Sequence, residues 1–388
     1  MLLQKYQTMM VLSLSILISS CTQVDDYMFG KDNTPIPSKL TDIKETSSFT
    51  QRWSVSTGKA GKTNAYLKLV PVIQHGTIYT ASPDGAVQAT EKGNGKILWS
   101  KQLPYHLVSG PVVDHEYMVV TTDSSMVVVL EKKDGSVRWK ANLSGDALAK
   151  PVIADGQVFV KTIDGNLYAY QLKTGEKLWV VDHGSPSLIL KASSSPVVMD
   201  KLVLVGFSDG RLDAVERKTG LVVWQRNIAY ASGGSDVERL IDIDADPIVI
   251  GDEIYLASYQ GYVGALSLKN GEFVWRKPAS IYKNIVISGG ALYYVDNDSV
   301  VWAINRTNGQ VLWKQPALKA RNLTEPVLMG NRLLVGETGG FLHGLNISNG
   351  ELVSRTPTSG PVFAAPVVAG SSVYVLTANG QLTRFSAK

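Results

Sequence analysis

Short runs of alternating apolar and polar residues, each closed by a turn that contains glycine, recur from about residue 51 onward. Alternation with a period of two is typical of β-strands that bury one face. The sequence DGNLYAYQLKTGEKLW at residues 164–179 predicts two strands joined by a Thr174-Gly175 turn. Glycine suits such turns because it adopts positive φ angles at no steric cost. Long runs of helix-forming residues are missing, so the pattern predicts an all-β protein.

Three spacings repeat together with this pattern. A first turn such as Asp164-Gly165 occurs eight times, and a glycine follows ten residues after its second member in seven copies. Four residues later comes a tryptophan in six copies and Ser354 in the seventh. Fourteen residues before the second member of the turn there is a proline in seven copies and Ile285 in the other. The repeated tryptophans are Trp99, Trp139, Trp179, Trp224, Trp275 and Trp313.

A unit of about 40 residues with four strands and a recurring tryptophan is the signature of a propeller blade. The eighth copy reaches Lys388 without a fourth strand, whereas residues 51–55 (QRWSV) match the strand that carries tryptophan. We therefore predict an eight-bladed β-propeller of four-stranded antiparallel blades, closed into a ring by the N-terminal strand. Residues 51–388 would form this single domain. The tryptophans should pack between neighbouring blades rather than form a ligand cage.

The N-terminal residues have the pattern of a targeting segment. Lys5 is followed by an apolar run at residues 9–18 and by two small serines before Cys21, which predicts a signal peptide at residues 1–20. The segment around Cys21 resembles a bacterial lipobox, and this resemblance implies cleavage before Cys21, its acylation and, with Thr22 next, the outer membrane. Cys21 is the single cysteine, so no intramolecular disulfide forms. An ordinary signal peptide is the alternative. Polar residues 21–50 then form a lipidated flexible tether.

Composition and charge limit the kinds of partner that the protein is expected to bind. The 388 residues are 44% hydrophobic and 19% charged, with a net charge of +4. That length alone favours two or three domains, but the repeat overrides it. The small net charge and the absence of dense basic stretches predict no binding of nucleic acid.

Three patterns resemble chemical sites, but their contexts predict no catalytic, cofactor or metal site. The G-x-S-x-G at residues 206–210 contains a blade turn followed by a strand, whereas a nucleophile elbow leads into a helix. The five histidines lack metal-ligand spacing and are expected at turns and on the surface. Asp242, Asp244 and Asp246 resemble a calcium loop, but Pro247 stands where that loop requires glycine.

The connections between blades vary in length, and function on a repeat scaffold tends to lie in such connections. Most intervals from the tryptophan position to the next proline position are 10–13 residues, but those ending at Pro71, Pro196 and Pro247 are 18, 17 and 23. The last two flank the fourth blade and combine apolar residues with carboxylates, which predicts a protein-binding patch. The alternative is that these loops bury their leucines over the propeller mouth. The candidate contacts are Leu188, Leu190, Lys191, Arg239, Asp242 and Asp244.

The blade repeat, the lipobox and the segment ERLIDIDADP at residues 238–247 together resemble the BamB family of the outer-membrane β-barrel assembly (BAM) machinery. The resemblance implies a non-enzymatic scaffold that binds the periplasmic POTRA domains of BamA and assists outer-membrane protein precursors. Leu188, Leu190 and Lys191 match the family's Leu-x-Leu-Arg motif, and Asp242 and Asp244 its acidic pair. Lys191 in place of arginine loses the planar fork that binds carboxylates in bidentate fashion.

Two other functions are compatible with parts of the sequence. PQQ-dependent quinoprotein dehydrogenases resemble the chain in their blade repeat, but they typically place a vicinal disulfide over the cofactor, and this chain has a single cysteine. A propeller that binds glycan or peptidoglycan is the other alternative.

Overall fold

The structure, a computed structural model, describes residues 35–59, 67–184, 193–229 and 242–387. Every regular element in these residues is a β-strand. No helix long and apolar enough to cross a membrane occurs in them. The ring of sheets described below belongs to a compact unit that begins at Ser38.

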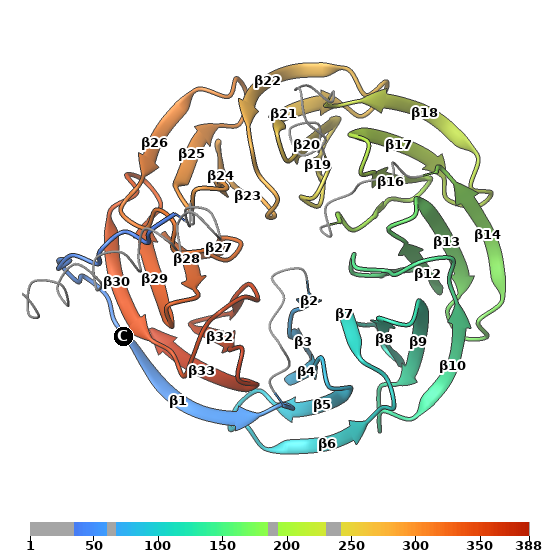
Figure 1. Cartoon of the computed structure of the whole chain (residues 1–388), viewed down its shortest axis with the longest axis horizontal. Helices are drawn as coiled ribbons and strands as arrows, with labels where there is room; N and C mark the ends of the chain where they lie inside the picture. The colour runs from blue at the N-terminus through green and yellow to red at the C-terminus, as the bar shows by residue number, and fades with distance from the viewer. Residues whose placement is uncertain (1–34, 60–66, 185–192, 230–241, 388) are drawn as a thin grey trace, which may run out of the picture. The chain divides into compact units, whose positions relative to one another are not determined.

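Eight sheets stand around a central axis as the blades of a propeller, which confirms the predicted fold (Figure 1). Neighbouring strands within each blade are antiparallel, and we number the blades in chain order. Blades one and two contain β3 (Val72–Gln74), β4 (Thr77–Ala81), β5 (Ala86–Glu91), β6 (Ile97–Gln102), β7 (Leu107–Val113), β8 (Tyr117–Thr122), β9 (Met126–Glu131) and β10 (Val137–Asn142). Blades three and four contain β11 (Val152–Ala154), β12 (Gln157–Lys161), β13 (Asn166–Gln171), β14 (Lys177–Asp182), β15 (Val197–Val198), β16 (Leu202–Gly206), β17 (Arg211–Glu216) and β18 (Val222–Asn227).

The remaining blades repeat this order. Blades five and six contain β19 (Ile248–Ile250), β20 (Glu253–Ala257), β21 (Gly261–Ser267), β22 (Phe273–Ala279), β23 (Val286–Ser288), β24 (Ala291–Val295), β25 (Val301–Asn305) and β26 (Val311–Gln315). Blades seven and eight contain β27 (Val327–Met329), β28 (Arg332–Glu337), β29 (Phe341–Asn346), β30 (Leu352–Pro357), β31 (Val367–Ala369), β32 (Ser372–Leu376), β33 (Gln381–Ala387) and β1 (Phe49–Ser56).

The N-terminal strand closes the ring as predicted. β1 pairs antiparallel with β33, and Trp53 lies opposite Arg384. β1 begins at Phe49, two residues before the boundary expected from the sequence. Closure in this way joins two distant parts of the chain in one sheet and removes a pair of free strand edges.

Each tryptophan of the repeat connects two blades. The indole Nε1 atoms of Trp99, Trp139 and Trp179 donate hydrogen bonds to the carbonyl oxygens of Lys132, Leu172 and Arg217, each in the following blade. The indole also covers the glycine of the turn between the third and fourth strands of that blade. The buried apolar residues form clusters that span neighbouring blades. The predicted packing of the tryptophans between blades is confirmed.

Blade seven is the exception, and its neighbour explains why. In blade eight the fourth strand is β1, so no turn joins it to β33 and no glycine stands there for an indole to cover. Blade seven accordingly has the buried Ser354 in the tryptophan position. Phe49, at the start of β1, is buried instead in the cluster between blades seven and eight, together with Leu342 and Phe385.

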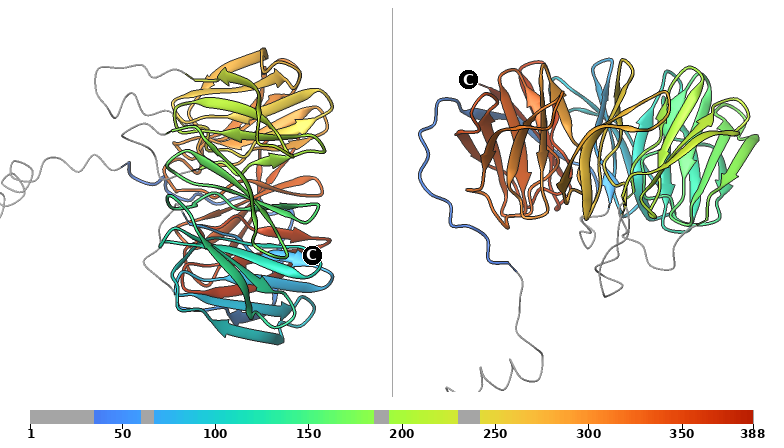
Figure 2. Two further views of the ribbon diagram at one scale, coloured as in Figure 1. Left: turned by 90° about the vertical axis from the view of Figure 1, so that its right-hand side faces the viewer. Right: turned by 90° about the horizontal axis from the view of Figure 1, so that it is seen from above.

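Residues 38–48, here called the N-terminal strap, lie along the outer side of blade seven (Figure 2). Arg321 Nη1 donates to the Ser38 carbonyl over 2.8 Å, and Arg355 Nη1 donates to the Thr41 carbonyl over 2.9 Å. The amides of Thr46 and Ser47 donate to one carbonyl of β30. The sequence predicted a flexible tether as far as residue 50. From Ser38 onward this segment is held against the propeller.

Two glycines allow the contact between indole and glycine to be tested. Gly220 and Gly251 both have positive φ, but an added Cβ at Gly220 would lie 2.9 Å from the Trp179 ring, whereas one at Gly251 meets nothing within 4 Å. Gly251→Ala should lower the free energy of unfolding by about 1 kcal/mol through backbone strain alone. Gly220→Ala should cost roughly 2 kcal/mol more, because the indole is also displaced. Urea denaturation of both variants measures the difference.

Trp179→Ala in the Gly220→Ala background supplies the control, since removing the indole should make the two substitutions non-additive. Equal losses for the two glycine variants would show that the indole contact contributes nothing to the choice of glycine.

Candidate partner-binding site

The two long connections that flank blade four, which end at Pro196 and Pro247, lie on one face of the ring. In every blade the first turn joins the second strand to the third, and a connection here called the lead-in joins the fourth strand to the next blade. Because the strands run up and down between the two faces (Figure 2), first turns and lead-ins share one face. The described part of the lead-in to blade four stops at Gly184 and resumes at Ser193. That of the lead-in to blade five stops at Ala229 and resumes at Asp242.

The predicted contact residues divide into two groups. Leu188, Leu190, Lys191 and Arg239 lie outside the described residues, as does Cys21. Asp242 and Asp244 are described, and both are completely buried. Any role of these two carboxylates in partner binding therefore has to act through the shape of their segment rather than through direct contact in this conformation.

Backbone contacts hold the segment 242–246 between blades four and five. Asp242 forms an antiparallel bridge with Tyr259, whose amide donates to the Asp242 carbonyl over 2.9 Å. The next side chain, Ile243, is buried against Gly206, where an added Cβ would lie 2.5 Å from Ile243 Cγ2. The first glycine of G-x-S-x-G thus makes room for this segment. A strand, β17, follows that motif, so it does not form a nucleophile elbow.

A buried lysine faces the aspartates from blade three. Lys161, the last residue of β12, is buried and its Nζ donates to the Gly206 carbonyl. Burial lowers the pKa of Lys161, and the charges of Asp242 and Asp244 oppose that shift. Burial raises the pKa of Asp242 to about 6 although Lys161 favours its charged form. Burial and then the neighbouring Asp242 raise the pKa of Asp244 well above its usual range.

These carboxylates are held by electrostatics more than by hydrogen bonds. None of the four oxygens of Asp242 and Asp244 has a hydrogen bond of normal geometry within the described part of the chain. A buried charge without such partners is costly. The charges of Lys161 and Lys68 favour the ionised forms of the two aspartates whereas burial favours the neutral forms, which makes the pair sensitive to pH.

The third aspartate of the motif has full partners. The Ser195 amide donates to Asp246 Oδ1 over 2.6 Å, and Asn284 Nδ2 donates to Asp246 Oδ2 over 3.1 Å. Burial raises the pKa of Asp246, but Lys68, Lys150 and the Ser195 amide together outweigh burial and bring it below the usual value. Over the described residues, no group of three or more His, Cys, Asp or Glu side chains is placed to hold a metal. This arrangement gives no support to a calcium loop.

A histidine holds the start of the blade-four lead-in. The imidazole of His183 contacts Asp213 through Nδ1 at 2.9 Å and Asp209 through Nε2 at 3.1 Å, and it stacks on Phe207 at 3.7 Å between ring centres. Burial opposes protonation, but the two carboxylates outweigh it and raise the pKa of His183. Sequence reasoning placed this histidine at the surface. The sequence contained one indication of this buried ion pair, because Asp213 is an acidic residue on the buried third strand of its blade.

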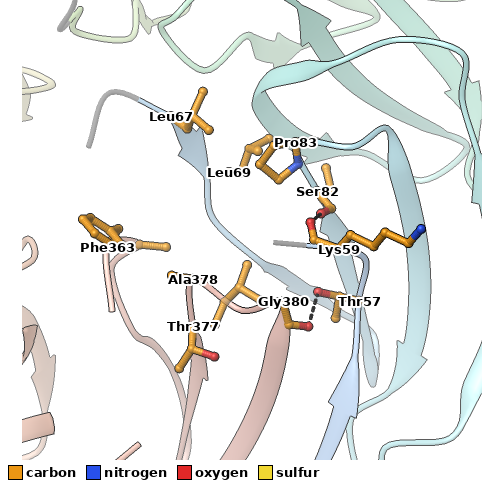
Figure 3. Close-up of a pocket in the computed structure, with 13 residues that line it drawn as sticks. Thr57, Lys59, Leu67, Leu69, Ser82, Pro83, Phe363, Thr377, Ala378 and Gly380 are labelled. Carbon is orange, nitrogen blue, oxygen red and sulfur yellow. Dashed lines mark hydrogen bonds between the residues drawn. The ribbon is translucent and has the colours of Figure 1, made fainter. Parts of the chain in front are cut away.

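An apolar pocket lies where the ring closes, between blades one and eight (Figure 3). Leu67, Leu69, Pro83 and Phe363 form much of its wall, and on one side Thr57 Oγ1 donates to the Gly380 carbonyl over 3.1 Å. The described lining contains no carboxylate, histidine or cysteine. Its polar lining consists of Thr57, Lys59, Ser82 and Thr377, so it lacks the carboxylate, imidazole and thiol groups that usually hold a metal.

Taken together, the fold and this face define a propeller of the protein-interaction class, with long lead-ins fixed at their ends by buried charges. The model of the family described as outer membrane protein assembly factor BamB matches residues 48–125, 83–315 and 315–388. Outer membrane protein assembly factor BamB of Legionella pneumophila is 52% identical over 377 residues, which cover 97% of this chain and 98% of that protein. The chain belongs to the BamB family.

Solved structures agree on the architecture. The crystal structure of BamB from Moraxella catarrhalis matches with a TM-score of 0.78 and 28% identity, covering 87% of this chain and 99% of that one. A europium-containing methanol dehydrogenase matches with a TM-score of 0.73 but 13% identity, covering 87% of this chain and 93% of that one. At that identity the dehydrogenase shares the fold alone.

Asp242 provides a pH test of the buried arrangement. Its pKa is about 6 in the folded protein against an ordinary 3.8, so the folded state binds the proton more tightly than the unfolded chain. Stability contributed by this group is therefore present at low pH and is lost as the pH rises from about 4 to about 6. The Asp242→Asn variant should not show this loss of stability. The unfolding free energy of the variant minus that of the wild type should therefore increase as the pH rises from about 4 to about 6.

Urea denaturation at several pH values measures the effect, and Asp200→Asn, at an exposed aspartate, is the matched control. A difference between Asp242→Asn and wild type that stays constant from pH 4 to pH 7 would contradict the raised pKa.

Proposed function

We propose that the protein is a non-enzymatic scaffold lipoprotein of the BAM complex that holds the POTRA domains of BamA and assists the folding and insertion of outer-membrane proteins. The observation that carries the proposal is the pair of long lead-ins around blade four, each fixed at a described end on the same face. His183 fixes the start of the first, and the segment 242–246 fixes the end of the second. Family membership over nearly the whole chain supports the assignment.

In this proposal the contact residues and the shaping residues are different. Leu188, Leu190, Lys191 and Arg239 make the contacts with BamA. Apolar side chains with a few charges are typical of the centre of a protein interface. Asp242 and Asp244 act from inside the ring by setting the course of the chain that leads away from Arg239.

Two observations support the absence of enzymatic activity in the proposal. The single cysteine, Cys21, lies far from the blades in sequence, so the propeller has no vicinal disulfide of the kind expected over PQQ. The apolar pocket at the ring seam has no carboxylate, histidine or cysteine in its described lining. The relatives are named as assembly factors.

We further propose that Cys21 anchors the protein by lipid to the periplasmic face of the outer membrane. The N-terminal strap shortens the tether, since Ser38 is the first described residue with a main-chain hydrogen bond to the propeller. The 17 residues 21–37 span at most about 60 Å when fully extended, at ~3.5 Å per residue. This reach keeps the propeller close to the membrane surface, where the barrel-inserting subunit works.

Leu190 tests the interface. Leu190→Glu places a charge in the proposed apolar contact and should reduce the BamA that co-purifies from membranes by at least about tenfold, the effect of ~1.4 kcal/mol. Leu221→Glu is the matched control, because Leu221 is 67% exposed and lies in blade four at the opposite face. It should retain BamA at the wild-type level. Retention of BamA by a folded Leu190→Glu variant would overturn the interface.

Cys21→Ser tests the anchor. The variant should lose labelling by palmitate and should move from the membrane fraction to the soluble periplasmic fraction, because a lipid-anchored protein without a spanning segment is held by its acyl chains. Fractionation in a strain that lacks BamA separates lipid anchoring from retention by the partner. A Cys21→Ser variant that stays with the membrane in that strain would contradict lipid anchoring.

A further inference from the structure

The lead-in to blade one is the third long connection, and it crosses to other blades. Its described end is β2 (Lys68–Leu69), which pairs in parallel with β7 of blade two, Lys68 opposite Ser109. β2 lies inside the ring rather than at its rim (Figure 1). The chain therefore passes near the propeller axis before it enters blade one.

From this position the Lys68 side chain reaches the ends of both lead-ins around blade four. Its Nζ donates to the Ser193 carbonyl over 2.6 Å and lies 3.7 Å from Asp246 Oδ1. Ser193 is the first described residue after residues 185–192, and Asp246 precedes the first strand of blade five. The side chain of Lys68 is 16% exposed and that of Asp246 24%. One largely buried ammonium thus contacts the two segments that the proposed interface depends on.

A direct bond between the same two segments makes this contact a three-way junction. The Ser195 amide donates to Asp246 Oδ1, the oxygen that faces Lys68. The charge of Lys68 also favours the ionised forms of Asp242 and Asp244. Three acidic side chains consequently share the field of Lys68, and its removal leaves Lys161 and Lys150 as the cations acting on them.

We propose that Lys68 is a positioning residue that joins the lead-ins of blades four and five from across the ring and so sets the BamA-binding arrangement of both. The proposal rests on the function proposed above. The interface would then depend on three lead-ins, because Lys68 in the lead-in to blade one contacts the other two from inside the ring.

Another buried lysine provides a matched control. Lys283, in the lead-in to blade six, lines the inside of the ring, and its Nζ donates to the Leu323 carbonyl in the lead-in to blade seven. Burial lowers the pKa of Lys283 to about 8. Lys283→Met therefore removes a buried ammonium and a lysine–carbonyl hydrogen bond, as Lys68→Met does, but at blades six and seven.

The experiment compares the full-length Lys68→Met and Lys283→Met proteins by co-purification of BamA from membranes and by amide hydrogen exchange. We expect Lys68→Met to retain about tenfold less BamA, the effect of a binding-competent arrangement populated at roughly one tenth. Exchange at residues 193–195 and 242–246 should become faster in Lys68→Met and stay unchanged in Lys283→Met. Lys68→Arg, which keeps the charge, should recover part of the binding. If Lys68→Met does not fold, Lys68→Gln takes its place.

Wild-type retention of BamA by Lys68→Met, or equal losses in Lys68→Met and Lys283→Met, would overturn the positioning role. Lower retention of BamA without faster hydrogen exchange at both segments would overturn it as well. Failure of the underlying function has a different signature, because the wild-type protein itself would then retain no BamA.

Discussion

The contact between the indole of one blade and a turn glycine of the next is the constraint on which the rest of the structure depends. Each contact fixes the outer strand of one blade against its neighbour, and Trp179 over Gly220 also donates a hydrogen bond to the Arg217 carbonyl. A side chain on that glycine would occupy the space of the ring. Because the lead-ins, except the one to blade eight, start from a strand fixed in this way, the face that carries them has a defined geometry.

The sequence predicted the fold well because the repeated contact leaves a repeated spacing. Trp53 identified the closing strand, and Ser354 marked the one blade whose neighbour lacks the turn. The surroundings of the candidate site could not be predicted in the same way. Asp242 and Asp244 looked like surface carboxylates, but both are buried, and Ile243 between them packs against Gly206 of blade four.

In the proposed function, the residues that contact a partner differ from those that determine the shape of the contact. Buried charges contribute little net stability, and hydrophobic residues of similar volume often replace them without loss. We interpret Lys161 and the aspartates as groups that favour one path of the chain. Ile243, between the two aspartates, packs against Gly206, and Asp246, after them, accepts a hydrogen bond from Ser195.

The N-terminal strap determines how the ring bears mechanical force. A pull along the tether reaches Ser38 first, where Arg321 holds the chain and is itself held by the fully buried Glu337 of blade seven through a bidentate ion pair. The load then passes along the outer side of blade seven before it reaches the pairing of β1 with β33. With the proposed lipid anchor at Cys21, tension on the tether would thus be taken up by the body of one blade, and the strand that closes the ring would be protected from being pulled out of its sheet.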